Sequence, residues 1–179
     1  LVGVFQMMES AKKLGKSEEG ESPAALSHGA VLGAGVMGGA IASLMAEKGI
    51  ATRLFDISPE GLDAAVIKHR KDLAKKKKRR RIERHQHDGA IDRLTTSAEL
   101  VGFQGAEVVI EAVAERLDVK HDVLGKLAAI CSEDTILATN TSSLSVDDIA
   151  APLPNPERVV GMHFFNPVKM MPLVEIVRG

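Results

Sequence analysis

The feature that most constrains this 179-residue chain is a short apolar run that leads directly into three spaced glycines. The run Ala30-Val31-Leu32 precedes the pattern Gly33-x-Gly35-x-x-Gly38, and apolar residues at helical spacing follow it. Gly33 permits a tight strand-to-helix turn, Gly35 lets a pyrophosphate approach the backbone, and Gly38 lets the helix pack against the strand. The unpaired N–H groups at the start of such a helix, together with its dipole, favour a bound phosphate.

A lone pattern of this kind is a weak signal, because a glycine-rich turn can also exist without a ligand. Here a second short apolar run, 51–55, ends in Asp56, close to the distance of roughly 20 residues that dinucleotide-binding units show. A carboxylate at this point accepts hydrogen bonds from a ribose 2′-OH and repels the 2′-phosphate of NADP, which favours NAD. We therefore predict a NAD site built by the three glycines, by Val36 and Met37 of the turn, and by Asp56.

Composition and charge narrow the class of protein without indicating a partner. The formal net charge is −1, and 3% of the residues are aromatic, with no Trp and no Tyr, which suits an aliphatic sheet core. Cys131 is the single cysteine, so neither an intrachain disulfide nor a cysteine metal cluster can form, and we expect a reducing, cytoplasmic location. The sequence has no apolar run long enough to span a membrane, and its first residues lack the pattern of a signal peptide.

The first 27 residues differ in pattern from the rest of the chain. Apolar positions between Val4 and Leu14 form a rough helical stripe, and a polar segment rich in Gly, Ser and Glu follows. We expect this leader helix and linker to belong to a domain upstream, although a frayed tail would show the same pattern. The predicted organisation is thus a leader at residues 1–27 and a dinucleotide-binding domain at residues 28–179.

Short apolar runs alternate with helical patterns through the second of these parts. We expect strands at 30–32, 51–55, 91–95, within 105–113, at 135–138, 159–162 and 173–177, and helices from 36, from 59, and at 98–103, 116–130 and 146–149. This alternation predicts an α/β fold of the Rossmann-like, doubly wound kind, with a mainly parallel sheet and helices on both faces.

The helix that starts at Pro59 runs into a block of positive charge from Lys75 to Arg81. A nucleic-acid surface is one interpretation, but no stacking aromatics interrupt the block, and a solvated helix face is the commoner use of such a run. A small molecule with several phosphates suits it better than a nucleic acid, because a phosphate site is already predicted nearby. After the block we expect a loose polar loop, in which His85, His87 and Asp88 bind no metal.

Polar residues follow two of the predicted strands. A cluster of small polar side chains, 139–143, comes directly after the strand at 135–138. Ligands of open α/β sheets bind beyond the carboxyl ends of the strands, so we interpret this cluster as part of a site. His163 follows the strand at 159–162, and Glu175 lies in the next strand, so these two side chains stand at facing ends and can meet.

Several separated segments together resemble the NAD-binding domain of the L-3-hydroxyacyl-CoA dehydrogenase family. They are Gly33-Ala34-Gly35-Val36-Met37-Gly38 with Asp56, then 110–115, Asn140-Thr141-Ser142-Ser143-Leu144, Gly161-Met162-His163-Phe164-Phe165-Asn166-Pro167, and Leu173-Val174-Glu175. The resemblance covers residues 28–179 and implies that His163 is the catalytic histidine, that Glu175 is its carboxylate partner, and that Ser142 contacts both the substrate hydroxyl and the nicotinamide side. It also implies cofactor contacts at Glu115, Lys120 and Asn166.

The same resemblance implies that Lys75, Lys76 and Lys77 lie near the phosphates of coenzyme A, although the run offers several registers for the contacting lysine. The residue types suit oxidation of an alcohol, in which the nicotinamide takes a hydride and a histidine takes the hydroxyl proton. A partner carboxylate fixes the histidine tautomer and stabilises the imidazolium.

Two departures from the family pattern concern the ends of the chain. The helical C-terminal domain of the family is absent from this sequence, and the leader resembles the linker after the enoyl-CoA hydratase part of multifunctional fatty-acid oxidation proteins. We therefore expect a middle domain of such a protein, in an oligomer or multienzyme complex, that is weakly active or inactive by itself. The alternatives are a single-function 3-hydroxybutyryl-CoA dehydrogenase, in which NADP becomes possible, and a dinucleotide-binding module without catalysis.

Overall fold

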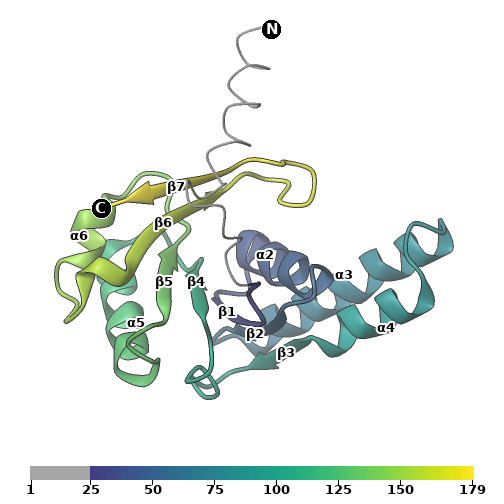
Figure 1. Ribbon diagram of the computed structural model, residues 1–179, viewed down its shortest axis with the longest axis horizontal. Coiled ribbons are helices and arrows are strands. Elements are labelled where there is room, and N and C mark those ends of the chain that lie inside the picture. The colour runs from purple at the N-terminus through teal and green to yellow at the C-terminus, as the bar shows by residue number, and fades with distance from the viewer. Residues whose placement is uncertain (1–24) are drawn as a thin grey trace, which may run out of the picture.

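The computed structural model describes residues 25–179, so the leader predicted at 1–27 lies outside the described residues except for its last three. Within the described part, seven strands form one sheet with the order β3-β2-β1-β4-β5-β6-β7 (Figure 1). The strands are β1 (His28–Leu32), β2 (Ala51–Phe55), β3 (Leu94–Ser97), β4 (Val108–Glu111), β5 (Ile136–Thr139), β6 (Val159–Phe164) and β7 (Val174–Arg178). Neighbouring strands are parallel, except that β6 and β7 form an antiparallel hairpin. The strand order reverses between β1 and β4, which confirms the predicted doubly wound fold.

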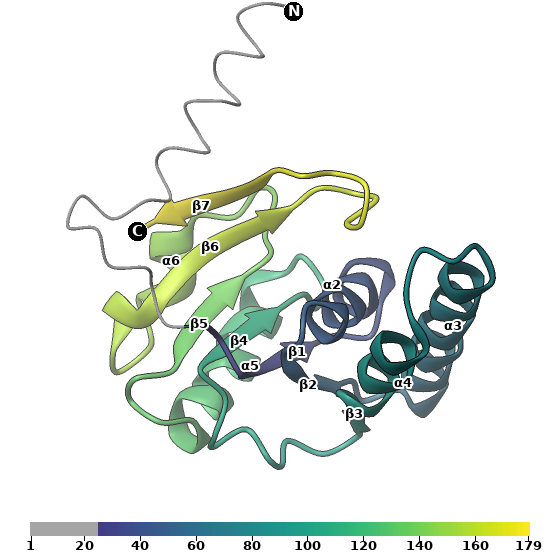
Figure 2. The ribbon, with the colours of Figure 1, turned by 45° about the vertical axis from the view of Figure 1, so that its right-hand side comes forward.

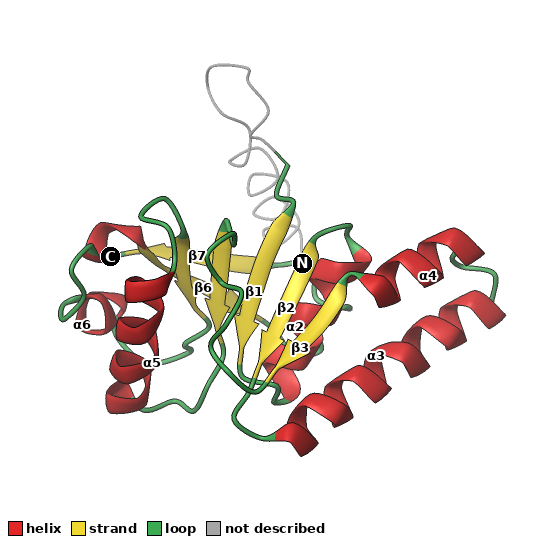
Figure 3. Ribbon diagram, turned by 90° about the horizontal axis from the view of Figure 1, so that it is seen from below, coloured by secondary structure: helices red, strands yellow, loops and turns green. Residues whose placement is uncertain are grey.

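Helices cover both faces of the sheet (Figures 2 and 3). One face packs against α2 (Val36–Glu47) and α3 (Pro59–Lys78), and the other against α5 (Leu117–Ile130) and α6 (Val146–Ala150). The alternation of side chains along β1 serves both layers: Val31 enters the apolar cluster with α2 and α3, whereas Ala30 and Leu32 enter the cluster with α5 and α6. A short 3₁₀ helix, η1 (Pro156–Arg158), leads into β6.

α3 begins as the sequence predicts. The Ser58 hydroxyl accepts a hydrogen bond from the Gly61 N–H at 3.1 Å, and Pro59 occupies the first helical turn. The helix continues through the lysines to Lys78, and Arg80 then adopts the left-handed conformation, with φ of 53°, as the chain turns back. The pair α3 and α4 (Arg84–Asp92) projects beyond the edge strand β3 (Figure 3).

α4 corrects the prediction of a loose loop after the basic block. Glu83 and Gln86 form a capping box, in which each side chain accepts a hydrogen bond from the other residue's backbone, and the Gln86 bond measures 2.8 Å. The carbonyl of Ala90 accepts a hydrogen bond from the buried His69 ring at 3.0 Å. These contacts hold a helix that has Ala90 as its buried residue, so the apolar periodicity that marks most helices is missing here.

Two further boundaries differ from the prediction. The third strand begins at Leu94 rather than Ile91, because α4 extends to Asp92. Residues 98–103 form bends and irregular backbone instead of a helix, and Gly102 within them adopts a φ of 78°, which a right-handed helix does not contain. Phe103 from this segment is fully buried and packs edge-on against Phe55. Among residues 25–179, no helix has the length and apolar character needed to cross a bilayer.

Candidate active site

The glycine turn has the geometry that its sequence predicts. Gly33 adopts a φ of 95°, and a Cβ there would collide with the carbonyl of Ala112, which follows β4. A Cβ at Gly38 would overlap the carbonyl oxygen of Gly33, so the first turn of α2 can lie against the strand only without a side chain. A Cβ at Gly35, by contrast, would meet nothing within 4 Å. The turn is therefore closed by Gly33 and Gly38 and open above Gly35, where a ligand would approach.

Asp56 lies at the end of β2 and is already bound to this turn. One carboxylate oxygen accepts a hydrogen bond from the Ala34 N–H at 2.6 Å, and the other accepts one from the Ser58 N–H at 2.8 Å. The side chain therefore joins the glycine turn to the start of α3. The structure places this acid beside the predicted phosphate site, as the sequence spacing requires.

A cavity of about 340 Å³ lies beyond the carboxyl ends of β4, β5 and β6. It brings together residues that are far apart in the sequence, including five of the predicted site residues. Its lining consists of Met37, Ala112, Val113, Glu115, Asn140, Ser142, His163, Phe164, Phe165 and Asn166. The cavity lies at the edge where open α/β sheets bind ligands.

His163 and Glu175 lie directly opposite each other in the antiparallel register of β6 and β7. His163 Nδ1 lies 3.2 Å from a carboxylate oxygen of Glu175, and the two side chains are 25% and 54% exposed. This contact places the ring hydrogen on Nδ1, which leaves the lone pair of Nε2 for another partner. The ring of Phe165 packs against the imidazole at a centroid distance of 4.6 Å and limits its rotation.

Glu115 organises the loop that carries Ser142. Its carboxylate accepts hydrogen bonds from the Thr141 hydroxyl at 2.6 Å and from the Ser142 N–H at 2.9 Å. Burial by itself raises the pKa of Glu115, but these hydrogen bonds and the nearby Lys120 charge bring it down to about 2. Glu115 is therefore ionised at neutral pH, and it fixes the backbone on which the Ser142 hydroxyl stands.

Lys120 lies below the cavity rather than on its surface. Its ammonium is fully buried, 2.8 and 2.9 Å from the two carboxylate oxygens of Glu111 and 3.3 Å from Glu115. Glu111 also accepts hydrogen bonds from the Thr139 hydroxyl at 2.7 Å and from the Val113 N–H at 2.8 Å. Glu111 and Thr139 lie in two segments singled out from the sequence, 110–115 and 139–143, but neither was given an individual role, although an acid at the end of an apolar strand is a visible signal.

Asn140, which follows β5 and belongs to the polar cluster predicted at 139–143, joins two strand ends. Its side-chain oxygen accepts a hydrogen bond from the Phe164 N–H at 2.9 Å, and this bond ties the end of β5 to the end of β6. Asn140 thus sets the relation between the Ser142 loop and the strand that carries His163.

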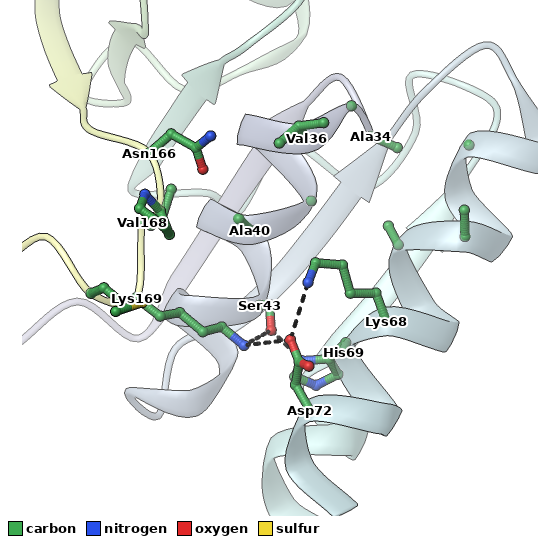
Figure 4. Close-up of a pocket in the computed structure, with 17 residues that line it drawn as sticks. Ala34, Val36, Ala40, Ser43, Lys68, His69, Asp72, Asn166, Val168 and Lys169 are labelled. Carbon is green, nitrogen blue, oxygen red and sulfur yellow. Dashed lines mark hydrogen bonds and ion pairs between the residues drawn. The ribbon is translucent and has the colours of Figure 1, made fainter. Parts of the chain in front are cut away.

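The basic block lies away from this cavity, along the distal part of α3. Lys76 pairs with Glu47 of α2, whereas Lys75 and Lys77 are exposed. A larger cavity, of about 440 Å³, lies between α2, α3 and the loop after β6 (Figure 4). Two cations, Lys68 and Lys169, are among the residues that line it. Among residues 25–179 there is no cluster of side chains suited to a metal ion, and His87 Nδ1 contacts Asp88 at 2.7 Å.

A glycine turn closed by an acid, at the carboxyl edge of a doubly wound sheet, defines the class of dinucleotide-binding Rossmann domains. Residues 28–179 match the family described as "3-hydroxyacyl-CoA dehydrogenase, NAD binding domain", and the chain belongs to this family. The family and the cofactor NAD agree with the expectations from the sequence.

Known relatives agree with this assignment. The fatty acid oxidation complex subunit alpha of Psychrobacter sp. (strain PRwf-1) is 40% identical over 179 residues, which are 100% of this chain and 25% of that protein. The structure of 3-hydroxybutyryl-CoA dehydrogenase from Escherichia coli K12 superposes with a TM-score of 0.83 at 39% identity and covers 86% of this chain and 32% of that one. The structure of (S)-3-hydroxybutyryl-CoA dehydrogenase from Ralstonia eutropha superposes with a TM-score of 0.82 at 34% identity. The match covers 87% of this chain and 55% of that one. The chain spans about a quarter of the length of the curated relatives it matches.

Proposed function

We propose that this chain forms the NAD-binding part of an enzyme that oxidises an L-3-hydroxyacyl-CoA to the 3-oxoacyl-CoA in fatty-acid β-oxidation. The observation that carries the proposal is that His163 lines one cavity with Ser142, Glu115 and Asn166 and is paired there with Glu175 through Nδ1. An imidazole with a partner carboxylate is the arrangement expected of a general base that works near neutral pH.

The chain's own residues would move the proton. NAD, when bound, supplies the hydride acceptor. His163 Nε2 accepts the proton of the substrate hydroxyl, and the Glu175 carboxylate at 3.2 Å from Nδ1 stabilises the imidazolium that forms. The Ser142 hydroxyl, on the wall of the same cavity, holds the substrate hydroxyl close to His163.

The cofactor would lie along the carboxyl edge of the sheet. The N–H groups of the glycine turn, at Gly35, Val36 and Met37, would hold the pyrophosphate, and Asp56 would bind the adenosine ribose. Glu115 and Asn166, which line the cavity, would contact the nicotinamide half. Lys120, for which the family resemblance implied a direct cofactor contact, would act on the cofactor only through Glu115, because its ammonium is enclosed between Glu111 and Glu115.

The coenzyme A end of the substrate would extend towards α3. Lys75 and Lys77 are exposed on this helix and offer charge to the phosphates, while Lys76 is held by Glu47. We propose further that the domain works within a longer multifunctional protein, in an oligomer or multienzyme complex in the cytoplasm. The similarity to an alpha subunit of a fatty acid oxidation complex supports this setting.

The test is a kinetic comparison in the full-length protein, with reduction of a 3-oxoacyl-CoA followed through the absorbance of NADH. We expect His163→Gln to lower kcat by about 10²- to 10⁴-fold, the range for loss of a general base. The dissociation constant for NADH, measured by calorimetry, should stay unchanged. His85→Gln, an exposed histidine on α4, is the matched control.

Three outcomes would contradict parts of the proposal. Undiminished turnover by His163→Gln would place the base elsewhere. Absence of turnover in the wild-type protein, together with tight NADH binding, would favour a binding module without catalysis. Tighter binding of NADPH than of NADH would contradict the role given to Asp56.

A further inference from the structure

The loop between β6 and β7, residues 165–173, is held at its middle by a charged network that the proposed reaction does not use. Lys169 Nζ lies 2.5 Å from a carboxylate oxygen of Glu47 and 2.8 Å from the Ser43 hydroxyl, both on α2. It also lies 3.8 Å from Asp72 on α3. Figure 4 shows the Lys169 side chain extending from the loop towards Ser43 and Asp72. One residue thus connects the catalytic hairpin to two helices.

A second, apolar anchor lies directly beside this ion pair. Val168 is 4% exposed and packs into the cluster that contains Ile41 and Ala42 of α2 and Ala65 of α3. Burial of a valine fixes how deep the loop lies but is not directional. The hydrogen-bonded ammonium of Lys169 adds direction, because its partners lie at defined positions along α2.

Ser43 continues the network into the interior. Its oxygen accepts a hydrogen bond from Lys169, so its own hydrogen is available to His69 Nδ1, at 2.6 Å. His69 Nε2 in turn donates to the Ala90 carbonyl at 3.0 Å. Burial holds the pKa of His69 below its ordinary value, so the ring is neutral and both of its nitrogens are used. The chain of hydrogen bonds therefore runs from the loop through α2 and α3 to α4.

The charges in this network nearly balance. Glu47 also pairs with Lys76, and Asp72 pairs with Lys68 at 3.4 Å. Burial raises the pKa of Glu47, but the hydrogen bonds from Lys169 and Lys76 outweigh it and hold that pKa below its usual value. The carboxylate that receives Lys169 is therefore charged throughout the neutral pH range.

The loop that Lys169 anchors carries part of the candidate active site. Asn166, three residues earlier, lines both the cavity of His163 and the larger cavity beside α2. The two ends of the loop join at the pair Phe164 and Val174, which is adjacent to the pair His163 and Glu175. A displacement of the loop would therefore move Asn166 and change the contact between the histidine and its carboxylate.

We propose that Lys169 is a positioning residue for the dehydrogenation: its ion pair with Glu47 fixes the β6–β7 loop on α2 and thereby preorganises Asn166 and the His163–Glu175 pair. The inference rests on the proposed function of His163. Since small misplacements of reacting groups can reduce a rate by about 10²-fold, loss of this pair acts on kcat.

The experiment uses steady-state kinetics of the full-length protein in both directions of the reaction. We expect Lys169→Met to lower kcat by about 10- to 100-fold, while KM for the acyl-CoA and the NADH dissociation constant change by less than about threefold. Lys169→Arg, which can keep the ion pair, should recover most of kcat. Lys126→Met removes an exposed lysine of α5 that pairs with Asp122, and it is the matched control.

Four results decide the matter. An unchanged kcat in Lys169→Met would overturn the proposal, and so would a rise in KM for the acyl-CoA at constant kcat, because Lys169 would then bind substrate rather than position the loop. If Lys169→Met does not fold, Glu47→Gln weakens the same pair from α2 and is judged by the same kcat criterion. If His163→Gln is also fully active, the proposed function itself fails; a wild-type kcat in Lys169→Met alone refutes only the positioning role.

Discussion

The Lys120–Glu111 pair and the His163–Glu175 pair lie at the same edge of the sheet, but only the first is closed off from solvent. Both side chains of the first pair are fully buried, whereas His163 and Glu175 are 25% and 54% exposed. Glu111 is saturated, since it accepts hydrogen bonds from Lys120, Thr139 and the Val113 backbone. His163 makes one bond through Nδ1 and retains the lone pair of Nε2.

The difference separates groups that build the site from groups that can react in it. A buried charge with every hydrogen bond satisfied cannot change protonation or partner without a large free-energy cost, so it holds shape. A partly exposed imidazole with one unused nitrogen can accept a proton. Lys120 and Glu111 therefore define where β4 and α5 meet, and through Glu115 they define where Ser142 stands.

The largest effect that this comparison predicts is on stability. Lys120→Met leaves the Glu111 carboxylate buried without its ammonium, so we expect a loss of about 3–5 kcal/mol in the free energy of unfolding, measured by urea titration. Lys126→Met, on the exposed side of the same helix, should cost about 0.3–0.5 kcal/mol. A cost below about 1 kcal/mol for Lys120→Met would mean that the pair is not the structural element described above.

The second prediction concerns Glu175, where we expect a large effect on activity and a small one on stability. Glu175→Gln keeps the shape of an exposed side chain, so we expect the free energy of unfolding to change by no more than about 0.5 kcal/mol. The neutral amide no longer stabilises the imidazolium of His163, so kcat should fall by about 10²-fold, measured in the same 3-oxoacyl-CoA assay. A variant that loses stability but keeps its kcat would show that Glu175 holds the shape of the site instead of taking part in the reaction.

Groups of the two kinds are not equally visible in the sequence. The glycine turn and Asp56 were predicted from local spacing, whereas the roles of His163 and Glu175 came from the family resemblance and their contact from position at strand ends. The environment of Lys120 could not be predicted in this way. A contact between a strand end and a helix nine positions later follows no period, and nothing local distinguishes the buried Lys120 from the exposed Lys126.

The same reason explains why two other features, the helix α4 and the Lys169–Glu47 bond, were not predicted from the sequence. α4 has Ala90 as its buried residue, so periodicity could not reveal it, although Glu83 and Gln86 at capping-box spacing were readable. The bond between Lys169 and Glu47 joins residues 122 positions apart and depends on how the β6–β7 loop lies on α2. Packing of distant segments determined both features, while local turn geometry determined the glycine turn and the start of α3, which the sequence predicted.

The smallest predicted effect concerns Glu115, which lies between the two kinds of group. Its folded pKa of about 2 lies below the ordinary value of 4.5, so the folded protein binds this proton less readily than the unfolded chain does. The resulting stabilisation is complete above about pH 5 and is lost as the pH falls towards about 2. Because the side chain is 36% exposed, solvent screens part of it.

Urea titrations of the wild type and of Glu115→Gln from about pH 7 to about pH 2 test this directly. The difference in unfolding free energy should stay constant down to about pH 5 and then shrink, whereas Glu133→Gln, an exposed control, should follow the wild type throughout. A difference that stays constant over the whole range would show that Glu115 titrates alike in the folded and unfolded protein. Glu115 would then not hold the Ser142 loop through its charge, and the link from the buried pair to the reactive pair would have to pass through Asn140, whose side chain already joins the ends of β5 and β6.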